Sequence, residues 1–451
     1  MPERFDAIVV GGRCAGASLA TLLARAGLRI CVVDRDAFPS DTPSTHGIQP
    51  PGVRVLERLG VADRLLEVSE PIVRGTLIVE DVRVDITGLL EVIGAPMLNV
   101  RRSTLDPILL ETAAAAGAEV RTRTAVTGLV EAVGRVVGVE TPDGELRAPL
   151  VVGADGARST VARLVGAAEY LRTPPGRAFL WSYFEGVEAD PHRVWLGSFA
   201  DLGFLASSTD AGLFMAAVTP SIERREELRR DRTGAYETGL RQLPELGPIV
   251  ASGRRAAPVR MMSNWHGFFR ESAGPGWALV GDAGHFKDPT PGQGIADALR
   301  QAVELAPAIE AALGGDRDPD AALREWWAWR DRDAWEMYWF ASSMGASGPP
   351  RLLEREVMRR IAADPALIAN LMRVLSHELP PSQLFSTSLA LRTFGSSFAK
   401  SPGRRRQLLA ELGTIVATEA RRGRKQLALR LGHRPWLPHS TRPGATPIRP
   451  Q

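Results

Sequence analysis

The chain has 451 residues, of which 44% are hydrophobic, and a formal net charge of only +3. Such a length predicts two or three domains with ample core, and so small a charge gives no sign of a nucleic-acid partner. No apolar run approaches the ~18 residues of a membrane span, and no signal peptide precedes the first predicted strand. The two cysteines, Cys14 and Cys31, favour a reducing compartment over a disulfide framework. We therefore expect a cytoplasmic protein.

The first informative segment is an apolar run over residues 6–10 that ends abruptly in Gly11-Gly12-Arg13-Cys14-Ala15-Gly16. A predicted helix follows over residues 17–26, and a second predicted strand over residues 28–33 ends in Asp34. A βαβ unit of roughly 30 residues, with an acid about 20 residues past the glycines, is typical of dinucleotide sites. The helix start would hold a pyrophosphate and the Asp34 carboxylate would accept ribose hydroxyls.

Arg13 stands where the G-x-G-x-x-G pattern has its middle glycine, the residue that lets the backbone approach the pyrophosphate closely. An ordinary strand-turn-helix without a nucleotide is one interpretation of this departure. The other is that the Arg13 guanidinium itself binds a phosphate, which suits its bidentate geometry.

Two further glycine-rich segments follow apolar runs in the same way. Residues 150–152 lead into Gly153-Ala154-Asp155-Gly156, which a structural turn explains equally well when taken alone. Residues 278–280 lead into Gly281-Asp282, and then a proline-bounded loop reaches a helix at about Ile295.

In the third segment, the Asp282 carboxylate would reach a ribityl hydroxyl. The backbone of residues 292–294 can approach a flat ring because glycine has no Cβ. The positive end of the new helix would stabilise an anionic reduced flavin. Together the three segments predict one FAD site.

These motifs resemble the FAD-dependent monooxygenases of the para-hydroxybenzoate hydroxylase fold, a family related to flavin-dependent halogenases and geranylgeranyl reductases. The likeness covers about residues 5–310, and G-x-R-C-A-G is the first motif of one branch, so Arg13 fits that branch. Arg102, in Arg102-Ser-Thr-Leu-Asp106, matches an R-x-x-L-D element whose arginine contacts the cofactor; a charged helix start is the alternative. The resemblance implies FAD contacts at Gly11, Gly12, Arg13, Ala15, Gly16, Asp34, Arg35, Arg102, Asp155, Gly156, Gly281, Asp282, Pro289, Gly292, Gln293, Gly294 and Ile295.

The expected fold is α/β (α+β overall): a Rossmann-like FAD-binding domain, an inserted antiparallel-sheet substrate domain and a helical C-terminal region. The FAD-binding domain would comprise residues 1–70, 101–170 and 271–345. Residues 71–100 would join it to the substrate domain at 171–270, a helical region would cover 346–434, and the proline-rich tail at 435–451 would be extended or disordered.

Aromatic residues of the predicted substrate domain are candidates for the pocket wall, with packing in the core as the alternative for each one. Farther along, residues 404–431 form an arginine-rich amphipathic segment, and such helices can make weak peripheral contact with anionic membranes. Solvated surface or an oligomer contact explains the segment too, and Gly413 and Gly423 interrupt its pattern. No transmembrane segment is expected. The pocket candidates are Trp181, Tyr183, Trp195, Phe204 and Phe214.

The resemblance implies that NADPH or NADH reduces the FAD, that dioxygen adds at the flavin C4a position, and that the hydroperoxide oxygenates an aromatic or other electron-rich small molecule. No second dinucleotide fingerprint appears, so NAD(P)H would visit the flavin. His46 and His285 are the candidate catalytic side chains, with Lys287 as another polar candidate; a structural hydrogen bond is the alternative for each. No metal-binding motif is present.

Three other functions are alternatives to a monooxygenase. A halogenase would carry W-x-W-x-I-P, but here Trp327-Ala-Trp329 is followed by Arg-Asp-Arg on a predicted helix. A geranylgeranyl-reductase-like enzyme that saturates an isoprenoid double bond would give the basic C-terminal segment a purpose. A non-catalytic flavin-binding protein would show no steady consumption of NAD(P)H.

Overall fold

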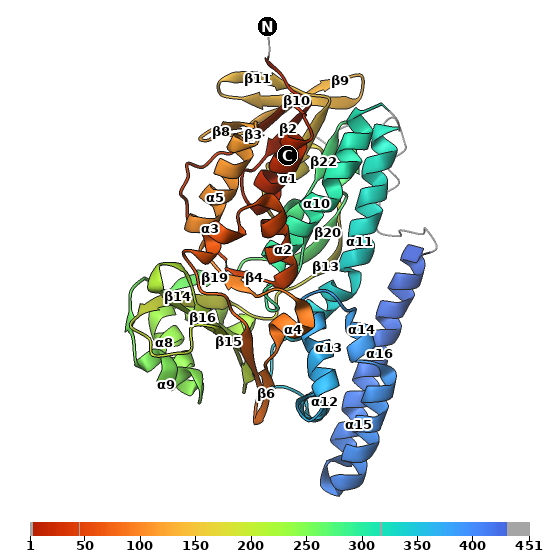
Figure 1. The fold of residues 1–451 in the computed structure, drawn as a ribbon. Helices are drawn as coiled ribbons and strands as arrows, with labels where there is room; N and C mark the ends of the chain where they lie inside the picture. Colours follow the sequence, from red (N-terminus) through yellow and green to blue (C-terminus); the bar gives the residue numbers. More distant parts are fainter. Residues whose placement is uncertain (1–2, 45, 316–317, 431–451) are drawn as a thin grey trace.

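The structure is a computed structural model that describes residues 3–44, 46–315 and 318–430 (Figure 1). At its centre lies a six-stranded sheet in the order β21-β22-β12-β2-β3-β8, in which all pairs are parallel except that of the edge strand β21. Every residue of β2, β3 and β12 is buried, as a parallel sheet covered on both faces requires. The strands are β2 (Ala7–Val10), β3 (Ile30–Val33), β8 (Glu119–Arg121), β12 (Leu150–Gly153), β21 (Ala273–Gly274) and β22 (Trp277–Leu279).

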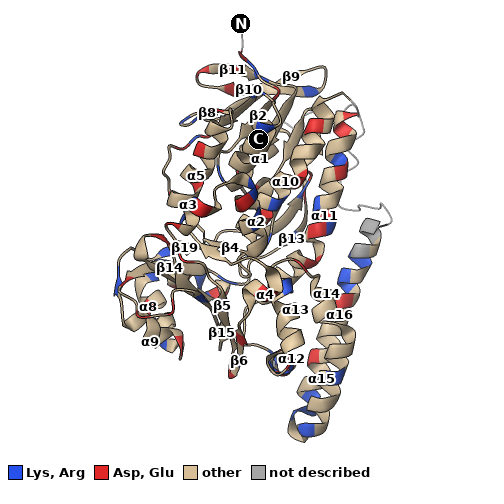
Figure 2. Ribbon diagram, viewed as in Figure 1, with Lys and Arg blue, Asp and Glu red and all other residues tan. Residues whose placement is uncertain are grey.

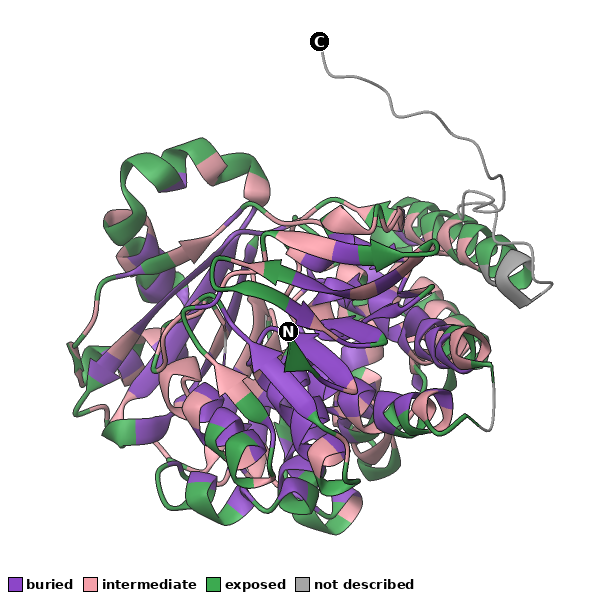
Figure 3. Ribbon diagram, turned by 90° about the horizontal axis from the view of Figure 1, so that it is seen from above, coloured by how far each residue is buried: buried purple, intermediate pink, exposed green. Residues whose placement is uncertain are grey.

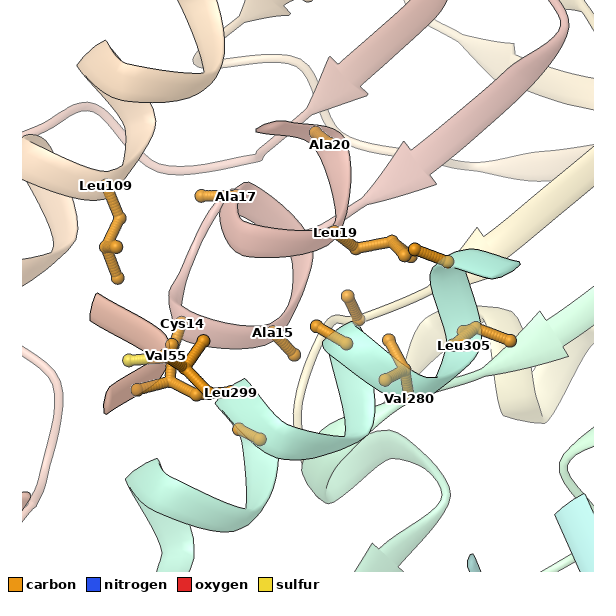
Figure 4. Packing of buried hydrophobic residues seen from close by; sticks show 14 of the residues in the cluster. Cys14, Ala15, Ala17, Leu19, Ala20, Val55, Leu109, Val280, Leu299 and Leu305 are labelled. Carbon is orange, nitrogen blue, oxygen red and sulfur yellow. The ribbon is translucent and has the colours of Figure 1, made fainter. Parts of the chain in front are cut away.

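One face of this sheet is covered by helices. The helix α1 (Cys14–Arg25) packs against both α5 (Arg102–Ala115) and α10 (Gly294–Leu313), and α11 (Pro319–Met344) packs on α10. Leu19, Leu109, Val280, Leu299 and Leu305 belong to the buried cluster between these elements (Figure 4). This packing brings segments from three distant parts of the chain together.

The opposite face is covered by a four-stranded sheet in the order β1-β11-β10-β9. A second hydrophobic cluster fills the space between the two sheets, and Figure 3 shows buried elements enclosed between exposed outer ones. The strands are β1 (Glu3–Arg4), β9 (Gly128–Ala132), β10 (Arg135–Thr141) and β11 (Gly144–Arg147).

A separate, mostly antiparallel eight-stranded sheet runs in the order β18-β14-β17-β16-β15-β5-β6, with β19 paired to β14. Its outer face packs on α8 (Arg232–Gln242) and α9 (Leu246–Ala251), so only its inner face can meet the rest of the molecule. The strands are β5 (Arg74–Val79), β6 (Val82–Ile86), β14 (Phe179–Glu185), β15 (Arg193–Phe199), β16 (Leu202–Ser208), β17 (Phe214–Pro220), β18 (Arg254–Arg255) and β19 (Arg260–Met262).

Past residue 345 the described chain is helical. The helix α12 (Leu352–Ala362) packs on β6, α13 (Pro365–Leu375) packs on α4, and α15 (Thr387–Lys400) pairs with the long α16 (Arg405–Arg430) at one end of the molecule (Figure 1). The predicted tail at 435–451 lies outside the described residues. The remaining elements are α2 (Pro50–Leu59), α3 (Ala62–Leu66), α4 (Leu89–Ile93), α6 (Thr160–Leu164), α7 (Arg225–Arg230), α14 (Pro381–Leu384), β4 (Gly47–Ile48), β7 (Leu98–Asn99), β13 (Glu169–Thr173), β20 (Gly267–Arg270) and β23 (His285–Phe286).

The predicted fold class is confirmed: a Rossmann-like parallel sheet, an antiparallel sheet and C-terminal helices are all present. Among the described helices, none is both long enough and apolar enough to cross a bilayer.

Candidate functional site

A cavity of about 580 Å³ lies at the carboxyl ends of the parallel strands. Its walls come from the segments that follow β2, β3, β12 and β22, which are adjacent strands, so one sheet edge gathers all three glycine-rich segments. The cavity, called here the FAD cavity, is lined by all the predicted cofactor residues except Gly12, Gly16 and Gln293.

The glycines of the first segment are required by close backbone packing. Gly11 has φ +105°, and a Cβ there would lie 2.5 Å from the carbonyl oxygen of Ala154. A Cβ on Gly16 would lie 1.8 Å from the carbonyl oxygen of Gly11. These two residues therefore shape the turn, whereas Gly294 has open space where its Cβ would be and lines the cavity directly.

The N-termini of three helices border the FAD cavity. The helices α1, α5 and α10 begin at Cys14, Arg102 and Gly294, which all line it, and none of the three has a side-chain cap hydrogen bond. The first N–H groups of a helix have no partner within the helix. Three sets of free donors with the positive ends of three dipoles make this cavity suited to an anionic ligand.

Asp34 is buried and follows β3, as predicted. Its carboxylate accepts hydrogen bonds from the backbone N–H groups of Gly12 (2.7 Å) and Asp36 (2.9 Å), and it lines the cavity beside Arg35. One role of Asp34 is therefore to fix the glycine turn to the end of the neighbouring strand. Contact with a ribose remains a prediction.

Arg13 is held by protein groups. Its guanidinium contacts Asp106 (2.8 Å), Asp36 (2.8 Å) and the Ser40 hydroxyl (2.9 Å), and it lies over the Phe38 ring. It also lines the cavity. Arg13 therefore links the loop after β3 to α5, which is a structural role. Phosphate binding by Arg13 stays a prediction.

Arg102 lies beside the start of α1. Its Nε donates to Asp106 at 2.8 Å, and the Cys14 thiol also lies 3.6 Å from the Asp106 carboxylate. Burial raises the pKa of the Cys14 thiol to about 12, so the thiol is neutral and unreactive. Arg102 keeps its charge at the cavity wall, where it offsets the nearby carboxylates.

The second motif has a clear structural role. The Asp155 carboxylate accepts hydrogen bonds from the Ser159 hydroxyl (2.5 Å) and the Thr160 backbone N–H (2.6 Å) at the start of α6. Gly156 adopts φ +78°, a left-handed conformation that glycine favours. Both residues also line the FAD cavity, so the turn interpretation and the cofactor interpretation describe compatible roles.

The third motif places a carboxylate in an unusual environment. Asp282 lines the cavity, and burial raises its pKa to about 6 although Arg102 and Lys287 act in the opposite direction. Asp288, in the same loop, accepts from the backbone N–H and hydroxyl of Thr290, and burial raises its pKa to about 6 as well.

A buried ion pair supports the loop from behind. Lys287 contacts Asp297 at 2.6 Å, and His377 lies 3.1 Å from the same carboxylate, with Arg300 close to both. Burial opposes ionisation of Asp297, but Lys287 and His377 hold its pKa well below the usual range. The network thus ties the loop to the start of α10 and to the end of α13.

Gln293 takes part in this support. Its side chain accepts from Lys287 (2.7 Å) and donates to the carbonyl oxygen of Leu375 (2.8 Å), and it does not line the FAD cavity. The C-terminal helical region therefore braces the loop through Gln293. No sequence pattern indicates this contact, because Leu375 lies 82 residues farther along the chain.

The two candidate catalytic histidines occupy different positions. His46 is buried, its Nε2 lies 2.5 Å from the Tyr183 hydroxyl, and it does not line the cavity although Ser44 and Gly47 do. Burial and the charge of Arg102 lower its pKa to about 3, so the imidazole is neutral. His285 lines the cavity, its Nε2 has no partner among the described residues, and burial lowers its pKa.

The predicted aromatic pocket is split by the pleat of the eight-stranded sheet. Trp181 lines the FAD cavity, and Tyr183 packs on the same inner face. Trp195, Phe204 and Phe214 belong to the cluster on the outer face, against α8 and α9. The expectation that all five line one pocket is therefore corrected: side chains of successive strand residues point to opposite faces, and these three have the outward phase.

A second, smaller pocket adjoins the FAD cavity at Gly47 and Gly292, which line both. Its open volume is about 50 Å³, and it is called here the apolar pocket because most of its wall is aliphatic. The wall lies on the inner face of the eight-stranded sheet and on α13. It includes Ile72, Ile86, Leu89, Val194, Leu196, Leu205, Met372 and Leu375.

Sequence reasoning missed several residues of the FAD cavity. Ser44 precedes β4, and Thr124, Ala125 and Val126 follow β8. The signal for the second group was available, since β8 is parallel to β3 and its carboxyl end reaches the same edge. The short β8 has no glycine after it, so no motif marked it.

The cavity fits FAD on the structure's own terms. It offers unpaired helix N–H groups for a diphosphate, backbone free of side chains at Gly294 for a flat ring, and an unpartnered buried nitrogen on His285. The N-terminus of α1 follows β2, whereas His285 and Gly294 follow β22, so distant parts of the chain supply these features to one cavity.

Comparison with known proteins agrees with this fit. Residues 4–340 match the model of the FAD binding domain family, so the chain belongs to that family. It is 30% identical over 328 residues to a menaquinone reductase of Mycolicibacterium smegmatis, covering 65% of this chain and 74% of that protein. It is 28% identical over 342 residues to a rifampicin monooxygenase of Streptomyces venezuelae, covering 69% of this chain and 65% of that protein.

Solved structures show the same architecture. The myxobacterial chondrochloren halogenase, described as an FAD-dependent halogenase, has a TM-score of 0.70 at 22% identity, and the match covers 87% of this chain and 97% of that one. The fold and the family together define this protein as an FAD-dependent oxidoreductase. Its relatives among the monooxygenases support FAD-dependent monooxygenase function.

Proposed function

We propose that this enzyme uses NADPH or NADH and dioxygen to insert one oxygen atom into an aromatic or other electron-rich small molecule. The observation that carries the proposal is the junction at Gly47 and Gly292, where the FAD cavity meets the apolar pocket. A ring-binding backbone at Gly292 to Gly294 would thus have an apolar substrate site directly beside it. The redox chemistry, acceptance of a hydride and activation of dioxygen, would come from the bound cofactor.

The protein's own contribution is binding, orientation and exclusion of water. The N-termini of α1 and α10 would hold the negative charges of the cofactor, and the Asp282 carboxylate would accept from a ribityl hydroxyl. The aliphatic walls of the apolar pocket would keep water from the substrate. The neutral His285, whose Nε2 has no partner among the described residues, would offer one hydrogen bond to the bound ring system.

A reconstitution experiment tests the proposal. The purified protein should bind FAD in a 1:1 ratio and turn yellow. After anaerobic reduction by NADPH and NADH in parallel samples, admission of oxygen in the presence of a phenol should give a product heavier by one oxygen atom. A protein that cannot be loaded with FAD, or that releases only hydrogen peroxide with every phenol, indole and polyketide offered, would contradict it.

One specific observation favours a second function, reduction of a double bond in an isoprenoid or related compound. The menaquinone reductase of Mycolicibacterium smegmatis is 30% identical to this chain. Dependence on dioxygen separates the two proposals: a reductase completes turnover without it, and its product gains two hydrogens instead of an oxygen atom.

We also propose weak peripheral contact of α15 and α16 with anionic membranes. Leu391, Leu409, Val416 and Leu427 are each more than half exposed, and Lys and Arg residues lie along both helices (Figure 2). Exposed apolar side chains beside basic ones suit a lipid surface with negative charge. Co-sedimentation with phosphatidylserine vesicles, weakened by 0.5 M salt and by Leu409→Ser, is the expected result; no co-sedimentation at low salt would exclude the contact.

A further inference from the structure

The loop between β23 and α10 contains one buried cation. Lys287 is 6% exposed and lines the FAD cavity, and its Nζ lies 2.6 Å from the Asp297 carboxylate and 2.7 Å from the Gln293 Oε1. Asp297, in the first turn of α10, lines the cavity as well. Lys287 and Asp297, called here the loop ion pair, are therefore fixed beside Gly292 and Gly294, which line the cavity on either side of Gln293.

The C-terminal helical region holds this pair in place. The Gln293 Nε2 donates to the carbonyl oxygen of Leu375 at 2.8 Å, and His377 lies 3.1 Å from the Asp297 carboxylate. The match to the FAD binding domain family covers residues 4–340, so Leu375 and His377 lie outside that domain. Contacts from a separate part of the chain thus fix both members of the loop ion pair.

Stability does not account for two opposite charges at the cavity wall. A buried ion pair gains little over apolar residues of similar volume, because both charges lose their contact with water. Burial opposes ionisation of Asp297, but the charge of Lys287 holds the pKa of Asp297 well below its usual range, so both charges persist. Lys287 is also the only lysine or arginine in the loop at residues 285–294.

We propose that the loop ion pair sets the reduction potential of the bound flavin, with Lys287 raising the potential and Asp297 lowering it. Addition of two electrons and one proton, the equivalent of one hydride, leaves a neutral ring with one negative charge. A nearby positive charge stabilises that product and a nearby negative charge destabilises it, so the two residues act with opposite signs. The inference rests on the proposed function, in which the FAD cavity holds FAD and NADPH or NADH supplies the hydride.

Other positive groups also face the cavity, namely the N-terminus of α10 and the Arg102 guanidinium. Both remain in variants of the loop ion pair, so a difference between such variants reports the pair alone. A purely structural role for the pair also gives a different result. Disorder of the loop would move the potential in the same direction whichever of the two residues is replaced.

The experiment measures the two-electron reduction potential of the FAD-loaded protein at pH 7 against a reference dye, without oxygen and without substrate. Lys287→Gln should lower the equilibrium constant for reduction at least ~10-fold, a fall of about 30 mV, and Asp297→Asn should raise it by a similar factor. The double variant, in which both charges are absent, should lie within about threefold of the wild type. Lys287→Arg, which keeps the charge, should do the same.

Arg135→Gln is the matched control. Arg135 contacts Asp320 at 2.7 Å, and the ion pair lines neither the FAD cavity nor the apolar pocket. Its loss changes the net charge of the protein by the same amount as Lys287→Gln, and we expect the potential to stay at the wild-type value. FAD affinity and far-UV circular dichroism are measured for every variant.

Two results would overturn the inference: an unchanged potential in Lys287→Gln, or shifts of the same sign in Lys287→Gln and Asp297→Asn. Should either single variant lose FAD, Lys287→Arg and the double variant decide. Both keep the charges balanced, so a shift of more than about threefold in either one would count against the inference.

Failure of the proposed function looks different. A wild-type protein that takes up FAD but oxygenates no substrate would contradict the proposed function alone, since the potentials are measured without turnover. An FAD-loaded Lys287→Gln variant with the wild-type potential would contradict the inference alone. A protein that binds no FAD would contradict both.

Discussion

The two large sheets of this molecule present their functional residues in different ways. In the parallel sheet, function depends on where a residue falls along the strand: the segments after Val10, Val33, Gly153 and Leu279 all meet at one edge. In the eight-stranded sheet, function depends on which face a side chain occupies. Trp181 and Trp195 show this, since one lines the FAD cavity and the other packs against the outer helices.

The difference has a simple geometric origin. The carboxyl ends of parallel strands all lie at the same edge of the sheet. The loops that follow these strands therefore meet at that edge. In an extended strand, successive side chains always point to opposite faces of the sheet. Which side chains face the ligand depends on what covers each face, and here α8 and α9 cover the outer face. A strand pattern therefore predicts that aromatic residues divide into two sets without saying which set faces the ligand.

The largest expected effect is a loss of stability when a tryptophan on the outer face of the eight-stranded sheet is removed. Trp195 is 5% exposed and packs on Phe214, with 5.9 Å between ring centroids. Trp195→Ala should lower the free energy of unfolding by about 3–5 kcal/mol, because it leaves a large cavity in the outer core. Urea unfolding followed by circular dichroism measures this change.

The matched variant is Trp181→Ala on the inner face. We expect Trp181→Ala to alter the visible absorption spectrum of bound FAD, while Trp195→Ala leaves that spectrum unchanged in the folded protein. A changed flavin spectrum in Trp195→Ala alone would mean that the assignment of the two faces is wrong.

The next effect tests the parallel sheet. Gly294 begins α10, and a Cβ there would point into open space at the cavity wall. Gly294→Leu should weaken FAD binding at least ~100-fold, about 2.7 kcal/mol, by filling that space. The stability of the FAD-free protein should hardly change. Fluorescence titration with FAD gives the affinity.

Gly395→Leu is the control for this prediction, since Gly395 also lies in a helix with open space around its Cβ but far along the chain in α15. Wild-type affinity in Gly395→Leu and lost affinity in Gly294→Leu would tie the effect to the cavity. Equal affinities in the two variants would remove α10 from the proposed cofactor site.

The sequence predicted the parallel region well because glycine turns, strand ends and helix starts are local features. The spacing of Gly11 and Gly16 predicts a tight turn, and the structure shows its physical cause: a Cβ on Gly11 would meet Ala154, and a Cβ on Gly16 would meet Gly11. The contact between Asp297 and His377 could not be found this way, since the two are 80 residues apart and His377 belongs to no motif. The same holds for the contact between Gln293 and Leu375.

The smallest expected effect concerns the pH dependence of FAD binding. The pKa of Asp282 is raised to about 6 in the FAD-free protein, above its ordinary value of 3.8, because burial penalises the carboxylate. A ribityl hydroxyl that donates to this carboxylate would favour the ionised form and lower the pKa again. FAD affinity should therefore rise about tenfold, or 1.4 kcal/mol, between pH 5 and pH 7 and level off above that.

The variants Asp282→Asn and Asp288→Asn show which carboxyl group causes the pH dependence of FAD binding. Both carboxyl groups have a pKa raised to about 6, but Asp288 already accepts from Thr290 within its own loop, so only Asp282 has the freedom to gain a bond from the cofactor. Asp282→Asn should abolish the pH dependence and Asp288→Asn should keep it. His285 within the loop and His46 near Gly47 do not interfere, because burial lowers the pKa of each below this range. A pH dependence that survives in Asp282→Asn would place the titrating group elsewhere and separate Asp282 from the cofactor.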